Sequence, residues 1–257
     1  MIDSYKRDAL WKTQLGNKIR LLMKICNTRW WSKAKALQTI FGSINYHENE
    51  LYSILLVVLY TIPVSDDFDG RTSSDARSLL DTWTSYETLV LAFTFMAVFQ
   101  HFTPVSNYLQ TQGLDISQAF NIIRNAKKKV EQLYDSFAGI VSKVNKIIHT
   151  INGKDVLEET DIYIETEFPP TRQRKVKKMP GEECIDKSST ISQQGPSKKI
   201  EIDTYKMIIN QITQSLNYRY TDYENTYRSF YYFDLHNFTE LRNAENINSE
   251  SFPTIQS

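Results

Sequence analysis

The stretch that decides the fold is residues 115–153, DISQAFNIIRNAKKKVEQLYDSFAGIVSKVNKIIHTING. Apolar side chains recur along it every three or four residues, over about ten helical turns. Asp115 suits an N-cap, and Gln118, three residues later, completes a capping-box pattern. Asn152-Gly153 suits a C-terminal helix end, because glycine readily takes the backbone conformations found there. The stretch therefore predicts one long amphipathic helix.

Helical spacing extends in both directions from this stretch. On the N-terminal side it predicts four helices, over about residues 4–26, 31–43, 51–62 and 74–102. Pro63 is predicted to end the third of these and Pro104 to limit or kink the fourth. The polar residues 65–74 read as a loop, and apolar spacing resumes over 205–231. Because neither an internal repeat nor a βαβ alternation is evident, we expect an all-α, multi-helix bundle.

Composition divides the chain into four parts. We expect an N-terminal helical part over 1–153, a disordered basic and polar linker over 154–200, C-terminal helices over 201–240 that pack on the same bundle, and a flexible tail over 241–257. Acidic residues, Pro169-Pro170, a basic run and a Ser/Gln/Lys-rich stretch follow one another in the linker. Such a segment buries too little apolar surface to order itself, although 156–164 could add a short strand-like piece.

The overall composition is that of an ordinary soluble protein. Of 257 residues, 41% are hydrophobic and 23% charged, and the formal net charge is zero. A field that draws DNA to the whole molecule is therefore not expected, and any nucleic-acid contact must be local. Cys26 and Cys184 lie far apart, which argues against a disulfide. Since no Cys/His cluster has the spacing of metal ligands, we expect neither a metal nor another cofactor.

Two apolar runs, Ile54–Val64 and Leu89–Phe99, stand out from this composition. Each is about half the length of roughly twenty residues that a membrane span needs. We interpret both as helices buried in the bundle and predict no membrane association.

Thr28-Arg29-Trp30, at the end of the first predicted helix, carries the best candidate binding residues. An indole face can stack on a base, and Arg29 could pair with a phosphate. The alternative is that Trp30 packs in the helical core with Arg29 at its rim, which the frequent burial of large aromatic side chains favours. Trp31 could be the exposed partner in either case.

Two charged groups complete the candidates. The basic residues of the predicted linker read either as a nuclear-localisation or nucleic-acid-contacting patch, or as solvated charges; they are Arg172, Arg174, Lys175, Lys177 and Lys178. The neighbouring acids Asp66, Asp67 and Asp69 lie in a predicted loop, where carboxylates are more often solvated charges or helix caps than metal ligands.

The order of short motifs along the chain resembles hAT-superfamily transposase-like proteins, especially the domesticated group with MYM-type zinc fingers. The resemblance covers about residues 15–235. Its landmarks are Thr28-Arg29-Trp30, Asp75-Ala76-Arg77-Ser78-Leu79-Leu80, Asn107-Tyr108-Leu109-Gln110, Leu114-Asp115-Ile116 and Leu216-Asn217-Tyr218-Arg219-Tyr220.

This resemblance implies a place within a larger architecture. In that family a helical insertion splits a ribonuclease-H-like fold that carries the catalytic acids, and the Arg-Trp motif lies in the insertion. The Trp of that motif can stack on a flipped base near a transposon end, a role that falls on Trp30 here. The chain would then be the insertion, with most of the nuclease fold absent.

We therefore expect a nuclear, transposase-derived fragment without enzymatic activity. It would bind DNA, protein partners or both, with self-association among the possibilities, and it would take no small-molecule substrate. Two alternatives stay open: a purely structural protein–protein interaction module, and an active hAT-type transposase. The second needs catalytic acids beyond those that the sequence justifies.

Overall fold

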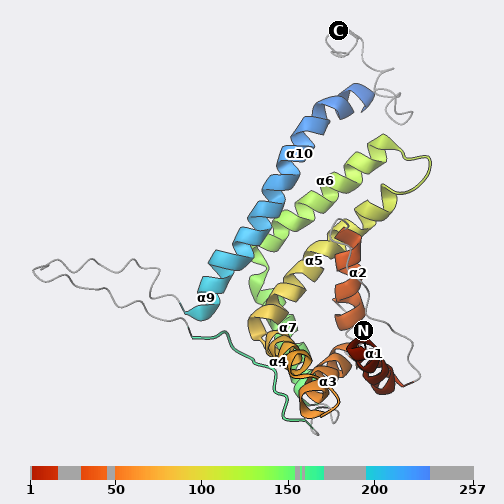
Figure 1. Ribbon diagram of the computed structural model, residues 1–257. Coiled ribbons are helices and arrows are strands. Elements are labelled where there is room, and N and C mark those ends of the chain that lie inside the picture. Colours follow the sequence, from red (N-terminus) through yellow and green to blue (C-terminus); the bar gives the residue numbers. More distant parts are fainter. Residues whose placement is uncertain are drawn as a thin grey trace, which may run out of the picture. The chain divides into compact units, whose positions relative to one another are not determined.

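The computed structural model describes residues 2–16, 30–44, 50–153, 157, 160–170 and 195–231 (Figure 1). The side chains of residues 2–4, Trp30, Glu50, Ser117 and 220–231 lie outside the description. The described residues form helices, turns and extended segments, with no strand among them, so the predicted all-α class is confirmed. The chain divides into two compact units, unit 1 (Met1–Ala97 and Ser136–Lys206) and unit 2 (Val98–Asp135 and Met207–Ser257).

Unit 1 begins with α1 (Ile2–Leu15), which buries Trp11 and Leu15. A longer helix, to about residue 26, was predicted, and that prediction is wrong at this end. The helix stops at Leu15 because Gly16 takes a left-handed backbone with φ of 57°. Residues 17–29 lie outside the described part of the chain. The second helix, α2 (Trp30–Phe41), matches its prediction closely.

The apolar helix α3 (Glu50–Val64) continues past the predicted stop at Pro63. Pro63 lacks a backbone N–H, but only Val64 follows it in the helix, so hardly any helix has to continue past the proline. The turn is closed by the N–H of Ser65, which donates to the carbonyl of Thr61 at 3.0 Å.

The single helix predicted over 74–102 is two helices, α4 (Gly70–Thr84) and α5 (Tyr86–Tyr108). The first starts early because the carboxylate of Asp69 accepts a hydrogen bond from the N–H of Thr72 at 3.0 Å, which caps the helix. The two helices separate at Ser85, whose ψ of 129° is extended. Pro104 lies inside α5, and the helix runs on to Tyr108.

The stretch that decided the fold is also interrupted. It forms α6 (Ile116–Gln132), a short 3₁₀ turn η1 (Leu133–Asp135) and α7 (Phe137–Asn152), so the prediction of one continuous helix is wrong. The break at Ser136 coincides with the boundary between the units. Both predicted ends hold: Asp115 accepts from the N–H of Gln118 at 3.3 Å, and the N–H of Gly153 donates to the carbonyl of His149.

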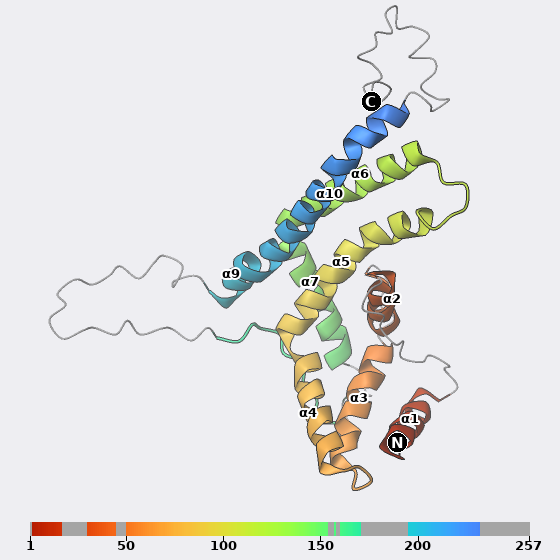
Figure 2. The ribbon, with the colours of Figure 1, turned by 45° about the horizontal axis from the view of Figure 1, so that its top comes forward.

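Aromatic rings fill the centre of unit 1. Phe41 of α2 is fully buried, and its ring centroid lies 5.0 Å from that of Tyr52 and 5.4 Å from that of Phe93. The hydroxyl of Tyr52 donates to the carbonyl of Trp83 at 2.6 Å, which ties α3 to the end of α4. Figure 2 shows α3 and α4 side by side, in agreement with their contacts. This cluster therefore fixes α2, α3, α4 and α5 of unit 1 to one another.

An extended segment, residues 160–170, crosses unit 1 after α7; we call it the strap (Figure 1). Ile164 is its buried anchor, with no exposed surface. The side chain of Asn152 holds the backbone of Ile164 on both sides: its amide donates to the Ile164 carbonyl at 3.2 Å, and its oxygen accepts from the Ile164 N–H at 3.3 Å. Farther along, the Phe168 ring meets Tyr86 edge-on, with centroids 4.6 Å apart.

Unit 1 ends with α9 (Pro196–Ile200) and the π-helical turn η3 (Glu201–Lys206), in which Tyr205 packs on Phe137 with ring centroids 5.2 Å apart. Unit 2 contains the end of α5, α6, η1 and α10 (Met207–Tyr231), which packs against α6. In the predicted capping box, the Oε1 of Gln118 accepts a hydrogen bond from the hydroxyl of Tyr108 at 2.8 Å.

One described helix, α5, is long and apolar enough to cross a membrane by length and composition alone. The sequence estimate of its apolar length was therefore too short. Half of its most apolar window is buried within the protein, and core helices of soluble proteins pass the same test.

Candidate nucleic-acid interface

Helix α2 exposes an aromatic and basic face. Trp31 is 37% exposed, and Lys35 and Gln38 are exposed four and seven residues further along. Residues at this spacing lie on one side of a helix, one above another. The helix carries two lysines and no acidic residue, so this side of α2 is locally positive. A chain with zero net charge can attract nucleic acid only through a locally positive surface, and this side of α2 is such a surface.

The rest of α2 holds this face in place. Ser32, Ala36 and Ile40 are buried, and Phe41 belongs to the aromatic cluster. Small buried residues let α2 pack against α3 while its aromatic end locks into the core. A ligand would therefore meet side chains on a rigid element, which lowers the entropy lost on binding.

The binding residues predicted from sequence lie mostly outside the described residues. Arg29 does so entirely, and Trp30 begins α2 with its side chain undescribed. Five basic residues also lie entirely outside the described part of the chain: Arg172, Arg174, Lys175, Lys177 and Lys178. Whether these seven residues lie together therefore stays a prediction. Of the alternatives for the Trp pair, it describes only Trp31, which is partly exposed.

Two of the aspartates between α3 and α4 make local hydrogen bonds. Asp69 caps α4, and its hydrogen bond from Thr72 lowers the pKa of the Asp69 carboxyl below its usual range. Asp67 accepts a hydrogen bond from the hydroxyl of Ser65 at 3.2 Å, and its backbone carbonyl accepts one from Lys6 at 2.7 Å. Among the described residues, no group of three His, Cys, Asp or Glu side chains could hold a metal ion.

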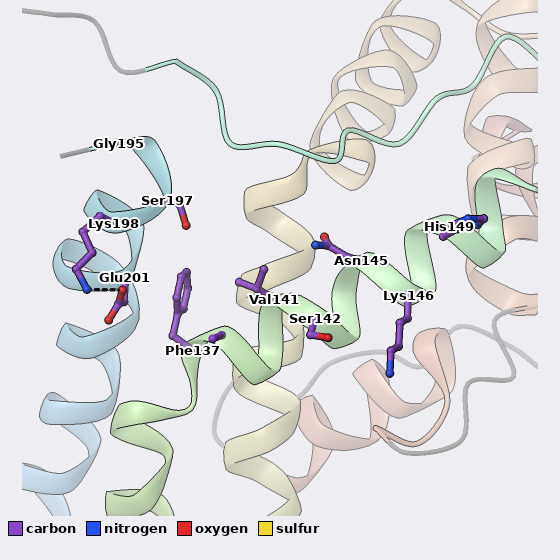
Figure 3. A pocket seen from close by; sticks show the side chains of 11 residues that line it. Phe137, Val141, Ser142, Asn145, Lys146, His149, Gly195, Ser197, Lys198 and Glu201 are labelled. Carbon is purple, nitrogen blue, oxygen red and sulfur yellow. Dashed lines mark hydrogen bonds and ion pairs between the residues drawn. The ribbon is translucent and has the colours of Figure 1, made fainter. Parts of the chain in front are cut away.

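Unit 1 also has an open groove of about 790 Å³ between α7 and the α9–η3 segment (Figure 3). Its lining residues are Phe137, Ala138, Val141, Ser142, Asn145, Lys146, His149, Gly195, Ser197, Lys198 and Glu201. The groove was not predicted from the sequence, although Ser142, Asn145 and His149 recur at the spacing of one helix face. The second wall, from α9, could not be foreseen, because 154–200 was expected to be disordered.

The charges in this groove are largely paired. Glu201 accepts from Lys198 at 2.8 Å and from Lys206 at 3.2 Å, and the hydrogen bond from Lys198 is the main reason why the pKa of Glu201 is lowered. Figure 3 shows Lys198 and Glu201 on one wall and Lys146 on α7. The Oδ1 of Asn145 accepts from the hydroxyl of Tyr86 at 2.6 Å, which leaves its amide N–H groups as donors. The groove therefore offers mainly hydrogen-bond donors.

Such a groove suits a ligand with acceptor oxygens. Its single carboxylate, that of Glu201, is engaged by two lysines. Of the two candidate regions, the α2 face therefore has the chemistry that best fits a nucleic acid, since it combines an exposed indole with an exposed ammonium group.

Comparison of the chain with known protein families, with curated proteins and with solved structures found no match.

Proposed function

We propose that this chain is a non-catalytic, transposase-derived helical module that binds nucleic acid through the exposed face of α2. The observation that carries the proposal is the shared face of Trp31, Lys35 and Gln38 on a helix that buries Ser32, Ala36 and Ile40 in unit 1. An indole can stack on any base, an ammonium group can neutralise a phosphate, and an amide can bind phosphate or a base edge.

The resemblance to hAT-type proteins also favours the N-terminal end of α2 as the binding surface. Trp30 and Arg29 directly precede the exposed face, and in that family the Trp of this motif stacks on a flipped base. The basic residues Arg172 to Lys178 would add phosphate contacts or a nuclear-localisation signal. In this proposal the chain is the helical insertion of a ribonuclease-H-like protein, works in the nucleus and needs no cofactor.

The test is binding of a fluorescent DNA duplex with a single-stranded 3′ overhang, followed by anisotropy at two salt concentrations. Stacking contributes about 1–3 kcal/mol per base, so Trp31→Ala is expected to weaken binding by about 5- to 150-fold. Lys35→Ala is expected to reduce the slope of log affinity against log salt by about one. Trp30→Ala tests the family-derived role in the same assay.

Lys33→Ala is the matched control, because Lys33 is an exposed lysine of the same helix but not of the same face. It is expected to leave stacking intact and to change the salt slope less than Lys35→Ala does. Equal losses for the two lysine variants, together with unchanged binding by Trp31→Ala, would rule out the α2 face as the binding surface.

A second candidate function, a protein–protein interaction module, is favoured by three exposed apolar residues of unit 2. Leu109, Leu114 and Ile116 are 46%, 38% and 46% exposed within eight residues of chain. Exposed apolar groups gathered in this way are typical of interaction sites. Light scattering over about a hundredfold range of protein concentration tests for self-association. Loss of any assembly in Leu114→Ser but not in Leu79→Ser, an isolated leucine 48% exposed on α4, would favour this function.

A further inference from the structure

Three tyrosines with described side chains are largely exposed: Tyr5 at 76%, Tyr163 at 65% and Tyr218 at 75%. Tyr5 lies in α1 and Tyr218 in α10, whereas Tyr163 lies in the strap, which has no helical hydrogen bonding. Enzymes that modify a tyrosine must enclose several residues of its backbone, and a helix has to unwind before they can. The strap already has the extended form, so Tyr163 differs from the other two in backbone shape.

The residues next to Tyr163 in the sequence are acidic, whereas those next to Tyr5 and Tyr218 include basic residues. Asp161, Glu165 and Glu167 surround Tyr163, and no basic residue lies between 160 and 170. Lys6 and Arg7 follow Tyr5, and Arg219 follows Tyr218. An acidic peptide complements an enzyme groove lined with lysine or arginine, since complementary charges raise the rate of encounter and suppress wrong partners. Shape and charge therefore both single out Tyr163.

The contacts that hold the strap limit the access of an enzyme to Tyr163. Along residues 162–164 the side chains alternate, so that Tyr163 faces outward while Ile164 next to it is fully buried. An enzyme that encloses both neighbours of Tyr163 cannot do so while Ile164 is held by Asn152. Local opening of such a surface segment costs much less than global unfolding. Release of the strap would therefore precede modification.

We propose that Tyr163 is a phosphorylation site for a protein tyrosine kinase that recognises acidic peptides, and that release of the strap presents it. In the reaction the phenolic oxygen of Tyr163 forms a bond to the γ-phosphorus of ATP, and the bond from that phosphorus to the β,γ-bridging oxygen breaks. ADP leaves, and the phenolic proton passes to the catalytic aspartate of the kinase and then to solvent. Nothing is oxidised or reduced.

The test uses the full chain, ATP and the isolated catalytic domain of a non-receptor tyrosine kinase that prefers acidic peptides. Phosphorylated residues are mapped by mass spectrometry and their initial rates are compared. Tyr163 is expected to be labelled at least about ten times faster than Tyr5 or Tyr218, which corresponds to a difference in barrier of about 1.4 kcal/mol. Tyr163→Phe is expected to lose most of the label. Labelling of Tyr5 or Tyr218 in preference to Tyr163, or no labelling at all, would overturn the proposal.

Asn152→Ala tests the release step, with Ser142→Ala as a control on the exposed side of the same helix. Loss of the two hydrogen bonds to Ile164 is expected to raise the rate at Tyr163 several-fold, while Ser142→Ala leaves it unchanged. The readout is the ratio of the rate at Tyr163 to the rate at Tyr5, because general unfolding would raise both. A ratio that Asn152→Ala leaves the same as in the unaltered chain would contradict the release step and with it the proposal.

Discussion

Removing one oxygen atom from the core of unit 1 should measurably destabilise it. The hydroxyl of Tyr52 donates to the carbonyl of Trp83 at 2.6 Å, and Tyr52 has no exposed surface. Trp83 lies one residue before the end of α4, so its carbonyl is among the last four of the helix, which have no partner within that helix. The hydroxyl of Tyr52 therefore satisfies an acceptor that α4 itself leaves open.

Tyr52→Phe keeps the ring and removes only this donor. The net loss of a neutral hydrogen bond is about 0.5–1.5 kcal/mol, and an unsatisfied buried acceptor costs about 1–3 kcal/mol. We expect the free energy of unfolding to fall by about 1–3 kcal/mol, since the bond is only partly buried and water can replace part of it. For a domain of this size that is a fall in Tm of about 3–10 °C.

The assay is urea denaturation and thermal melting followed by circular dichroism, with Tyr60→Phe as the matched control. Tyr60 is a half-buried tyrosine of the same helix, and the structure gives its hydroxyl no hydrogen bond to the described residues. Its removal is expected to change stability by less than about 0.5 kcal/mol. If both variants melt together, the hydrogen bond from Tyr52 to Trp83 does not stabilise unit 1, and the reasoning that it satisfies an open carbonyl of α4 is wrong.

Three further predictions concern other parts of the chain. Ile164→Ala should lower the free energy of unfolding of unit 1 by about 2–5 kcal/mol, measured by urea denaturation, because it empties a fully buried position; an unchanged midpoint would mean that the strap does not dock. Gly113→Ala should lower Tm by the equivalent of about 1–2 kcal/mol, because Gly113 has a left-handed φ of 73° that alanine adopts only with strain. Gly70→Ala is the control and should not lower Tm, because Gly70 has open space around it and no left-handed φ. Equal Tm values for the two variants would contradict this reasoning. Burial, and then Lys129, lower the pKa of His101, so the folded state binds this proton less tightly than the unfolded state. The stability that neutral His101 contributes is therefore present above about pH 6.5 and is lost as the pH falls below that value. In urea denaturation between about pH 7.5 and 5, His101→Gln should flatten this loss of stability.

The sequence by itself determined the helical class of this protein and several of its helix ends. Apolar spacing of three to four residues reports a helix wherever the core lies on one side, and a cap such as Asp115 acts within a single turn. Both are local effects, so they can be read without knowing what the helix packs against. The sequence also marked Trp31 as a candidate for exposure, and its side chain is 37% exposed.

Only the tertiary structure decided where the long helices break and which residues become accessible. Ser85 and Ser136 each precede a helix, where serine is a favoured N-cap, but serine also occurs within helices, so the residue alone does not predict a break. The breaks allow segments on either side to bury different faces, and the second one coincides with the boundary between the units. In the same way, composition alone gave the strap no reason to be ordered. Asn152, twelve residues earlier, satisfies both polar groups of the Ile164 backbone, so Ile164 can be buried without an unpaired backbone group. A local pattern in the sequence does not show this pairing.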